Sequence, residues 1–243
     1  DHRDLHSFPT RRSSDLPRHV QGLEAEFTEL KRHNFPFGIK LLSKQEIRDT
    51  IGTNAYIGGL LNMGNGHLHP LNLCIGEAKA AVNLGATIYE QSPVLRIEKQ
   101  SKPMVVTEQG SITADFVVLA GNAYHFLEPK LRGIMFPVNS FILATEPLSE
   151  DIVCEINPQD LAVCDPNYIL EYFRLSADKR LLFGGRCNYF GRDPDVIRRH
   201  LMPRMLKIYP QLVGTRIDFS WGGTIGVPIN RVPQIGQIGR AHV

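Results

Sequence analysis

The stretch Ile112–Tyr124, ITADFVVLAGNAY, guides the interpretation of the whole sequence. Its centre, Phe116–Ala120, is an uninterrupted apolar run, typical of a strand covered on both faces in a mainly parallel sheet. The small-residue turn Gly121-Asn122-Ala123 follows directly. Ligands lie at the carboxyl ends of strands in open α/β sheets, and glycine lets the backbone approach them closely. We therefore predict a buried strand that ends at a ligand site; a buried strand with an ordinary glycine turn is the alternative.

The composition limits the classes of protein to which this chain can belong. With 243 residues, 42% of them hydrophobic, the chain can bury the core of one large or two small domains. No apolar run is long enough to span a bilayer, and a formal charge of +2 gives no reason to expect nucleic acid as a partner. The four cysteines, which include no CxxC pair, favour a reducing compartment over a disulfide framework or a zinc site. They are Cys74, Cys154, Cys164 and Cys187. We expect a cytoplasmic protein.

The two ends of the chain do not look native. The first sixteen residues, DHRDLHSFPTRRSSDL, have no apolar periodicity and no signal-peptide core. His6–Leu16 is the string that a common short-read sequencing adapter encodes when read in frame, and the last six residues, IGRAHV, match the opposite adapter. We predict that residues 1–16 and 238–243 are adapter-derived and that residues 17–237 are a fragment of the native protein. A natural basic tail is the alternative.

Helical and extended patterns alternate in the first half. Apolar residues at helical spacing predict a helix over residues 20–34, and a capping box at Ser43 opens a second helix. Pro70 opens a third, which ends at the C-cap Gly85. Its predicted buried stripe is Leu73, Ala80, Ala81 and Leu84. Strands over residues 86–90 and 93–98 and a hairpin over residues 104–114 then lead to Phe116.

After Pro129 the pattern becomes that of an antiparallel sheet with one helix. We predict strands over residues 136–146, 168–175, 180–185 and 216–221, and a helix over residues 193–208. The stretch 222–228, GGTIGVP, reads as a glycine-rich exit from the last strand. The second half therefore differs in architecture from the first.

Four segments together resemble the D-amino-acid-oxidase-like flavoprotein family, whose members include glycine oxidase and sarcosine oxidase. They are GHLHPLNLCIGEA (66–78), VVLAGNAY (117–124), YFRLSADKRLLFGG (172–185) and RVPQIG (231–236). Each segment alone is a weak signal, but the four in this order and spacing are specific. The resemblance covers nearly all of residues 17–237, and it is greatest to members that oxidise gamma-glutamylputrescine.

The resemblance implies the fold and the domains. It implies α/β plus α+β architecture: an incomplete, Rossmann-like FAD-binding domain with an antiparallel-sheet substrate domain. Residues 17–129 would form the partial FAD-binding domain with inserted helices. Residues 130–220 would form the substrate-domain sheet with its covering helix, and residues 221–237 would return to a truncated FAD-binding domain.

The resemblance also implies chemistry and site residues. FAD would take hydride from the carbon next to the amine of a small-molecule substrate, and the protein would position both. The segments that match the family's cofactor contacts contribute Val94 at the adenine, with Ala120, Gly121 and Asn122 in the turn near the pyrophosphate. On the substrate side the matching residues are Tyr168, Tyr172, Arg174 and Trp221.

Arg174 has two interpretations. Strand alternation places Tyr172 and Arg174 on one face, with Glu171 and Phe173 on the other. An arginine can hold a carboxylate bidentately, and a gamma-glutamyl substrate carries one. The alternative is a structural salt bridge within the sheet. No general base is identified, so the catalytic residues stay unknown.

Two departures from the family pattern bear on activity. A GxGxxG turn between a strand and a helix is absent, and Gly58-Gly59 and Gly64–Gly66 lack the required spacing. The C-terminal glycine-rich flavin loop is absent too. We therefore expect this chain to hold part of an FAD site and to be inactive alone.

His67 and His69 raise the question of a metal. Two histidines on one face could share an ion, but no nearby residue is spaced to supply a third ligand, so we predict none. Loop histidines near the substrate entrance, or at the start of the helix, are the preferred interpretation. Two other functions stay open: a glycine- or sarcosine-type oxidase, and a non-catalytic flavoprotein-fold binding subunit. The electron acceptor and the oligomeric state are left open.

Overall fold

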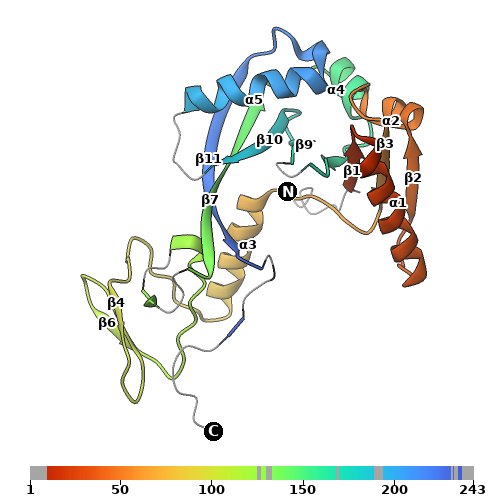
Figure 1. The fold of residues 1–243 in the computed structure, drawn as a ribbon. Helices are drawn as coiled ribbons and strands as arrows, with labels where there is room; N and C mark the ends of the chain where they lie inside the picture. The colour runs from red at the N-terminus through yellow and green to blue at the C-terminus, as the bar shows by residue number, and fades with distance from the viewer. Residues whose placement is uncertain are drawn as a thin grey trace. The chain divides into compact units, whose positions relative to one another are not determined.

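The chain divides into two compact units, each formed by two segments. Unit 1 comprises Asp1–Cys74 and Ser140–Gly223, and unit 2 comprises Ile75–Asn139 and Thr224–Val243. The computed structural model (Figure 1) describes residues 10–124, 127–129, 133–167, 170–188, 194–230, 232 and 235–236.

Unit 1 is built on an eight-stranded sheet with the order β11-β7-β10-β9-β8-β1-β3-β2. The strands are β1 (Thr10–Ser14), β2 (Ile39–Ser43), β3 (Gly58–Asn62), β7 (Met135–Thr145), β8 (Ala162–Cys164), β9 (Tyr172–Leu175), β10 (Leu181–Asn188) and β11 (Ile217–Pro228). The pairs β2–β3, β1–β3, β8–β9 and β9–β10 are antiparallel, whereas β1 and β8 run parallel. Strands β7 and β11 extend beyond the boundary into unit 2.

The helices of unit 1 differ in how they begin, and a serine cap starts two of them. They are α1 (Pro17–Arg32), α2 (Lys44–Ile51), α4 (Glu150–Ile156) and α5 (Pro194–Ile208), with a short 3-10 helix, η4 (Pro210–Leu212). Ser43 caps α2: its Oγ accepts from Glu46 N, and the Glu46 carboxylate accepts from Ser43 N at 2.8 Å. Such a box satisfies donors that the first helical turn leaves unpaired. The register of α2, which buries Ile47 and Ile51, follows from this cap.

Three aromatic rings form the centre of the core of unit 1. Phe173 stacks on Phe183 with ring centroids 5.8 Å apart and meets Tyr209 edge-on at 5.4 Å. All three side chains are almost fully buried. Ile197, Leu201 and Met205 of α5 belong to the same cluster, so one apolar face of α5 covers the sheet at β9 and β10. Offset and edge-to-face aromatic pairs add to the stabilisation from buried area.

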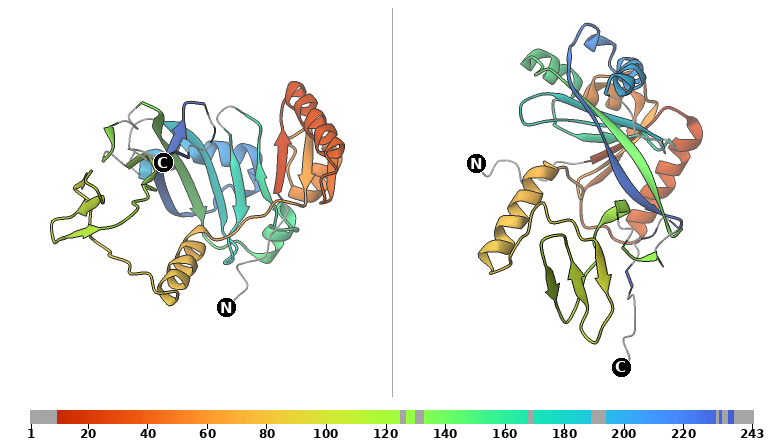
Figure 2. Two further views of the ribbon diagram at one scale, coloured as in Figure 1. Left: turned by 90° about the horizontal axis from the view of Figure 1, so that it is seen from below. Right: turned by 90° about the vertical axis from the view of Figure 1, so that its left-hand side faces the viewer.

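Unit 2 holds a small separate meander (Figure 2). Its strands β4 (Arg96–Glu98), β5 (Met104–Val106) and β6 (Ser111–Thr113) pair antiparallel in the order β4-β5-β6. Helix α3 (Pro70–Asn83) enters unit 2 at Ile75, and the 3-10 helix η2 (Asn122–Tyr124) follows the meander.

Asn122 ties the turn before η2 to the second half of β11. Its amide donates to Thr224 O at 3.1 Å and its Oδ1 accepts from Gly226 N at 2.7 Å. The residue has a left-handed backbone (φ +52°), which asparagine tolerates better than most residues. Gly226 is needed at this contact, because a Cβ there would lie 2.8 Å from Asn122 Oδ1 and 2.2 Å from Met135 Sδ.

Predictions that rest on local signals are confirmed. The capping box at Ser43, the C-cap at Gly85 (φ +95°) and the hairpin of β5 and β6 are present. The predicted strand over residues 136–146 is β7, and the helix over residues 193–208 is α5. The glycine-rich stretch 222–228, however, continues β11 instead of leaving it.

The predicted buried strand at Phe116–Ala120 is wrong. The segment is irregular, and Phe116 and Val118 are 89% and 86% exposed. A strand covered on both faces needs neighbours to supply hydrogen bonds and side chains, and among the described residues no strand pairs with this segment. The strand predicted at 86–90 is wrong for the same reason, and only residues 96–98 of the next one form β4.

The predicted buried stripe of α3 is also wrong. The helix is present, but none of its residues is buried, and Leu84 just beyond it is 90% exposed. Helical periodicity shows which residues share a face, whereas burial requires a surface that covers that face.

Residues 10–74 belong to unit 1. Thr10–Ser14 form β1, paired on both sides although the sequence TRRSS carries no apolar signal, because strand pairing uses backbone groups that every residue has. Residues 17–74, predicted to join the FAD-binding domain, group with Ser140–Gly223 in unit 1, and the domain assignment stays a prediction. The buried Thr53 hydroxyl, for example, bonds Ile208 O at 2.5 Å. The adapter origin of the two ends stays a prediction, which sequencing the gene across both ends would check.

Candidate functional site

Strand β9 presents two chemically different faces. Phe173 and Leu175 are buried, whereas Tyr172 and Arg174 are half-buried on the other face, which confirms the predicted alternation. Glu171, just before the strand, accepts a hydrogen bond from Arg204 Nε of α5. Burial raises the pKa of the Glu171 carboxyl, although the Arg204 contact acts in the opposite direction. The face that bears Tyr172 and Arg174 is the candidate substrate surface of unit 1.

Tyr172 is held in place by residues of β10, the adjacent strand, and of β7, one strand further away. Its hydroxyl lies 2.7 Å from Ser140 Oγ of β7. On β10 its register partner is Gly184, where a Cβ would lie 2.0 Å from Tyr172 Cε2. The missing side chain at Gly184 is therefore what allows the aromatic ring to lie across the sheet.

We expect Gly184→Ala to displace the Tyr172 ring and to break its contact with Ser140. Overpacking of this kind costs about 1–3 kcal/mol. Gly185→Ala is the matched control, because the nearest atom to a Cβ there is Leu170 O at 3.4 Å, an ordinary contact. Urea unfolding of both variants measures the difference. Equal losses of unfolding free energy would show that Gly184 has no special role.

The guanidinium of Arg174 bonds main-chain oxygens instead of a carboxylate. Nη1 donates to Leu175 O at 3.0 Å and Nη2 to Leu68 O at 3.1 Å, and Nη1 lies 3.5 Å from His67 Nδ1. Burial lowers the pKa of Arg174, and the charge of Asp160 partly offsets this. The salt bridge within the sheet, our alternative interpretation, is not what the described residues show.

The hydrogen-bond inventory of Arg174 leaves one edge of the guanidinium available. A guanidinium has five N–H groups in a planar fork. Nη1 and Nη2 each donate to one main-chain oxygen and Nη1 also faces His67 Nδ1, whereas the Nε–H and the second Nη2–H have no acceptor among the described residues. The remaining pair of donors has the geometry of a bidentate carboxylate site.

The two histidines of the loop before α3 have separate contacts. His67 Nε2 lies 2.9 Å from Asp160 O, and its side chain is 10% exposed. His69 Nδ1 accepts from Asn72 N at 3.3 Å, so this ring satisfies a donor at the start of α3. Among the described residues, no three His, Cys, Asp or Glu side chains are grouped to hold a metal ion.

The other predicted substrate residues are less informative. Trp221 lies in the part of β11 that belongs to unit 1 and is 43% exposed. Tyr168 lies outside the described residues. The structure thus brings Tyr172 and Arg174 onto one face and gives no contact that links them to Trp221.

The four predicted cofactor residues all lie in unit 2. Val94 is half-buried just before β4, where Leu95 N bonds Val106 O at 2.8 Å. Ala120, Gly121 and Asn122 are exposed, and the Asn122 side chain is engaged with β11. The main chain at Ala120 and Gly121 is therefore open to an approaching ligand, on a turn that Asn122 fixes. Their role at a dinucleotide stays a prediction, and the helix that begins among them is the three-residue η2.

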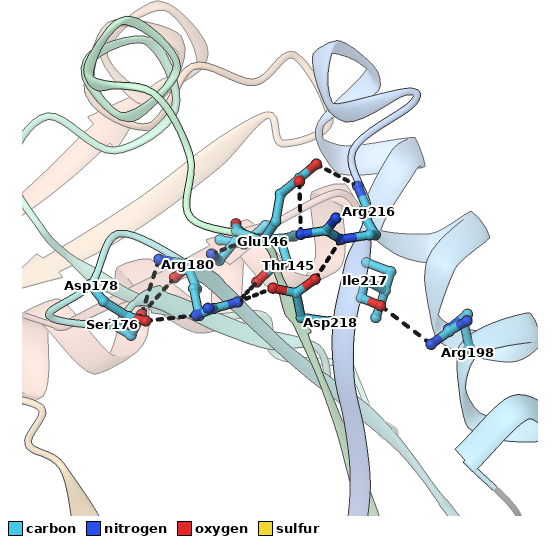
Figure 3. Close-up of polar contacts among 10 residues, drawn as sticks. Thr145, Glu146, Ser176, Asp178, Arg180, Arg198, Arg216, Ile217 and Asp218 are labelled. Atoms are coloured by element: carbon cyan, nitrogen blue, oxygen red, sulfur yellow. Dashed lines mark hydrogen bonds and ion pairs between the residues drawn. The ribbon is translucent and has the colours of Figure 1, made fainter.

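Sequence reasoning missed a polar network at one end of the sheet (Figure 3). Arg180 Nη1 donates to Thr145 O at 2.8 Å and to Asp218 Oδ2 at 2.6 Å, and Arg180 Nε donates to Asp178 Oδ2 at 2.6 Å. Arg216 adds a second cation at Asp218, with Nε 2.7 Å from Oδ1. The network joins β7, β11 and the turn before β10. Its partners are far apart in sequence, so only the turn residues gave a local signal.

Because of these ion pairs, we expect the thermal stability of the chain to depend on pH. Hydrogen bonds from Arg180, then Arg216, lower the pKa of Asp218 below the ordinary carboxyl range. The stabilisation is therefore complete above the pKa of the unfolded carboxyl and is lost as pH falls through the lowered pKa. We expect Asp218→Asn to melt at a lower temperature than the unsubstituted chain near neutral pH, with a difference that shrinks in acid. Melting curves over a pH series measure this; a difference that is constant with pH would contradict it.

The described part of the chain contains no helix that is both long and apolar enough to cross a membrane.

Comparisons with known proteins identify the relatives of this chain. The family model described as FAD dependent oxidoreductase (DAO) matches residues 5–243, which includes most of the two ends assigned above to adapters. Gamma-glutamylputrescine oxidoreductase of Escherichia coli is 42% identical over 202 residues, which cover 82% of this chain and 47% of the relative. A probable oxidoreductase, OrdL, of Haemophilus influenzae is 40% identical over 220 residues, or 88% of this chain and 50% of the relative.

Among solved structures, glycine oxidase from Geobacillus kaustophilus has the same fold with a TM-score of 0.85. It is 20% identical, and the match covers 98% of this chain and 64% of the other. The chain therefore spans about half the length of the curated relatives it matches.

Proposed function

Since the chain belongs to the DAO family of FAD-dependent oxidoreductases, we propose that it is part of an enzyme that oxidises gamma-glutamylputrescine or a related amine. The observation that carries the proposal is the 42% identity to a relative named for that substrate, over 82% of this chain. Bound FAD would supply the chemistry, by accepting hydride from the carbon next to the amine. The residues of this chain would bind, orient and shield the reactants.

We assign the cofactor side to unit 2. The exposed main chain of Ala120 and Gly121 is proposed to approach the FAD, with Asn122 fixing the turn through Thr224 and Gly226. Val94 is proposed as the adenine contact, since the resembling segment of the family serves that role. Backbone contacts suit a cofactor whose phosphates need many N–H donors and no bulky side chain.

We assign the substrate side to unit 1. Tyr172 and Arg174 share the open face of β9, and Trp221 and Tyr168 are proposed as further walls of the pocket. The Nε edge of Arg174 would hold the carboxylate of the gamma-glutamyl group, because its two remaining donors match a carboxylate bidentately. The Tyr172 hydroxyl, which lies 2.7 Å from Ser140 Oγ, would help to orient the substrate.

The first expected result concerns the chain by itself. It offers one wall of the FAD site, and the described residues include no GxGxxG turn, so we expect the purified chain to retain no FAD. Absorbance of the purified protein and a fluorescence titration with FAD measure this. A flavin absorbance band that co-purifies with the chain would contradict the expectation.

The function itself is tested in a chimera in which this chain replaces the aligned segment of the Escherichia coli relative. The relative then supplies the rest of the FAD site. We expect the chimera to bind FAD and to oxidise gamma-glutamylputrescine. A folded chimera that binds FAD and oxidises only glycine or sarcosine would favour an amino acid oxidase, and one that turns over no amine would favour a non-catalytic binding subunit.

A further inference from the structure

We propose that His67 is a positioning residue for Arg174, whose guanidinium it orients by accepting a hydrogen bond at Nδ1. The proposal deepens the proposed function, because it concerns the arginine assigned there to the substrate carboxylate. It assigns a role to a loop histidine that is 107 positions away in sequence from the arginine it contacts.

The contacts of His67 define one tautomer. Asp160 O is a carbonyl oxygen and can only accept, so His67 Nε2, 2.9 Å away, carries the hydrogen. The guanidinium of Arg174 can only donate, so His67 Nδ1, 3.5 Å from Nη1, is the acceptor. A neutral ring with its hydrogen on Nε2 satisfies both contacts at once, and no other protonation state does.

The support beneath His67 is a hydrogen-bonded turn. Asp160 has a left-handed backbone (φ +48°) in a turn built on the buried Asn157. Asn157 Nδ2 donates to Leu161 O at 2.8 Å, and its Oδ1 accepts from Leu161 N at 2.9 Å. This turn holds Asp160 O, which orients the His67 ring, and the ring in turn limits where Arg174 can lie. Orienting contacts of this kind are known to tune histidine ligands and general bases.

Leu68, the next residue of the loop, completes the arrangement. Its carbonyl accepts from Arg174 Nη2 at 3.1 Å, while His67 faces Nη1. Two adjacent loop residues therefore face the Nη1–Nη2 end of the guanidinium. This placement leaves the Nε edge for a ligand, so His67 decides which edge of Arg174 a carboxylate meets.

Protonation of His67 would reverse its effect. A hydrogen on Nδ1 would point at the guanidinium of Arg174, and two cations would then face each other. The opposing charge is Asp160, whose Oδ1 lies 3.8 Å from His67 Nε2 and has no hydrogen-bond partner among the described residues. The neutral ring is therefore the form that fits the observed contact with Arg174.

Two substitutions separate the two contacts of the ring. In His67→Asn the side-chain oxygen takes the place of Nδ1, so the acceptor for Arg174 remains and the donor to Asp160 is lost. In His67→Gln the side-chain nitrogen takes the place of Nε2, so the donor to Asp160 remains and the acceptor is lost. The variants are close in size and both neutral, which makes each the control for the other.

The test uses NMR on the 243-residue chain, without substrate or cofactor. We expect the ¹⁵N signals of His67 to show a hydrogen on Nε2 and none on Nδ1 near neutral pH. We expect separate Arg174 Nη–H signals in the unsubstituted chain and in His67→Asn, and averaged signals in His67→Gln. A hydrogen on Nδ1, or equal effects of the two substitutions on Arg174, would overturn the proposal. The tautomer is measured on the unsubstituted chain, so it tests the proposal even if a variant fails to fold.

Enzyme kinetics of the chimera test whether His67 affects substrate binding. Loss of one hydrogen bond of ordinary strength predicts that KM for gamma-glutamylputrescine rises about three- to tenfold in His67→Gln, with kcat unchanged. Putrescine, which has no carboxylate, should show no change. If the chimera does not oxidise gamma-glutamylputrescine at all, the proposed function fails, while the NMR result still decides the role of His67.

Discussion

Replacing Phe173 by alanine is expected to destabilise unit 1 more than any other single change considered above. The side chain is 2% exposed, stacks on Phe183 and meets Tyr209 edge-on. A buried Phe→Ala substitution costs about 3–5 kcal/mol, which is a large part of the roughly 5–15 kcal/mol that stabilises a typical domain. Urea unfolding followed by circular dichroism measures the loss.

The control for this substitution is Phe37→Ala. Phe37 lies in the same unit but is 54% exposed and meets only Phe35 edge-on at 5.5 Å among the described rings. We expect it to lose less than about 1 kcal/mol, because an exposed ring buries little area. Similar losses for the two variants would show that the aromatic cluster at β9, β10 and Tyr209 is not the core of the unit.

Arg174→Ala is expected to have the largest effect on catalysis in the chimera. Two charge-assisted hydrogen bonds to a carboxylate are each worth about 1.5–3 kcal/mol. Their loss predicts a fall in kcat/KM for gamma-glutamylputrescine of about a hundredfold or more. Putrescine lacks the carboxylate, so its oxidation should change much less.

Arg174→Lys tests whether the positive charge alone is sufficient. Lysine keeps the positive charge but cannot donate side by side to a carboxylate and two main-chain oxygens, so we expect only partial recovery. Arg174 also bonds Leu68 O and Leu175 O, and the melting temperature of each variant must therefore be measured alongside the kinetics. Equal losses for the two substrates would show that Arg174 is structural and does not bind the carboxylate.

The parts of the fold that were predicted correctly rest on local signals. The capping box at Ser43, the C-cap at Gly85 and the alternation in β9 depend on residues a few positions apart. Such patterns are visible in one sequence because their physical cause is local.

The wrong strand predictions concern pairing partners, which cannot be identified from one sequence. The run Phe116–Ala120 has the composition of a buried strand, yet no described strand pairs with it. Strand β1 has no apolar pattern and is nonetheless paired on both sides. In both cases the outcome depends on the backbone groups that lie alongside, and those come from distant parts of the chain.

The candidate site also has features that the sequence predicts and features that it does not. Alternation along β9 placed Tyr172 and Arg174 on one face correctly. Arg174 contacts His67, which is 107 positions away in sequence, and Arg180 bonds Asp218, which is 38 positions away. No spacing rule predicts either contact. The sequence therefore indicated which residue types matter, and only the structure shows what orients them.

The most direct test of the account is the substrate preference of the chimera. It should be loaded with FAD, and kcat/KM should be measured for gamma-glutamylputrescine, putrescine, sarcosine and glycine. We predict the highest value for gamma-glutamylputrescine, because this chain contributes the face that bears Tyr172 and Arg174. A chimera that binds FAD and prefers glycine or sarcosine, or does not distinguish gamma-glutamylputrescine from putrescine, would contradict the account.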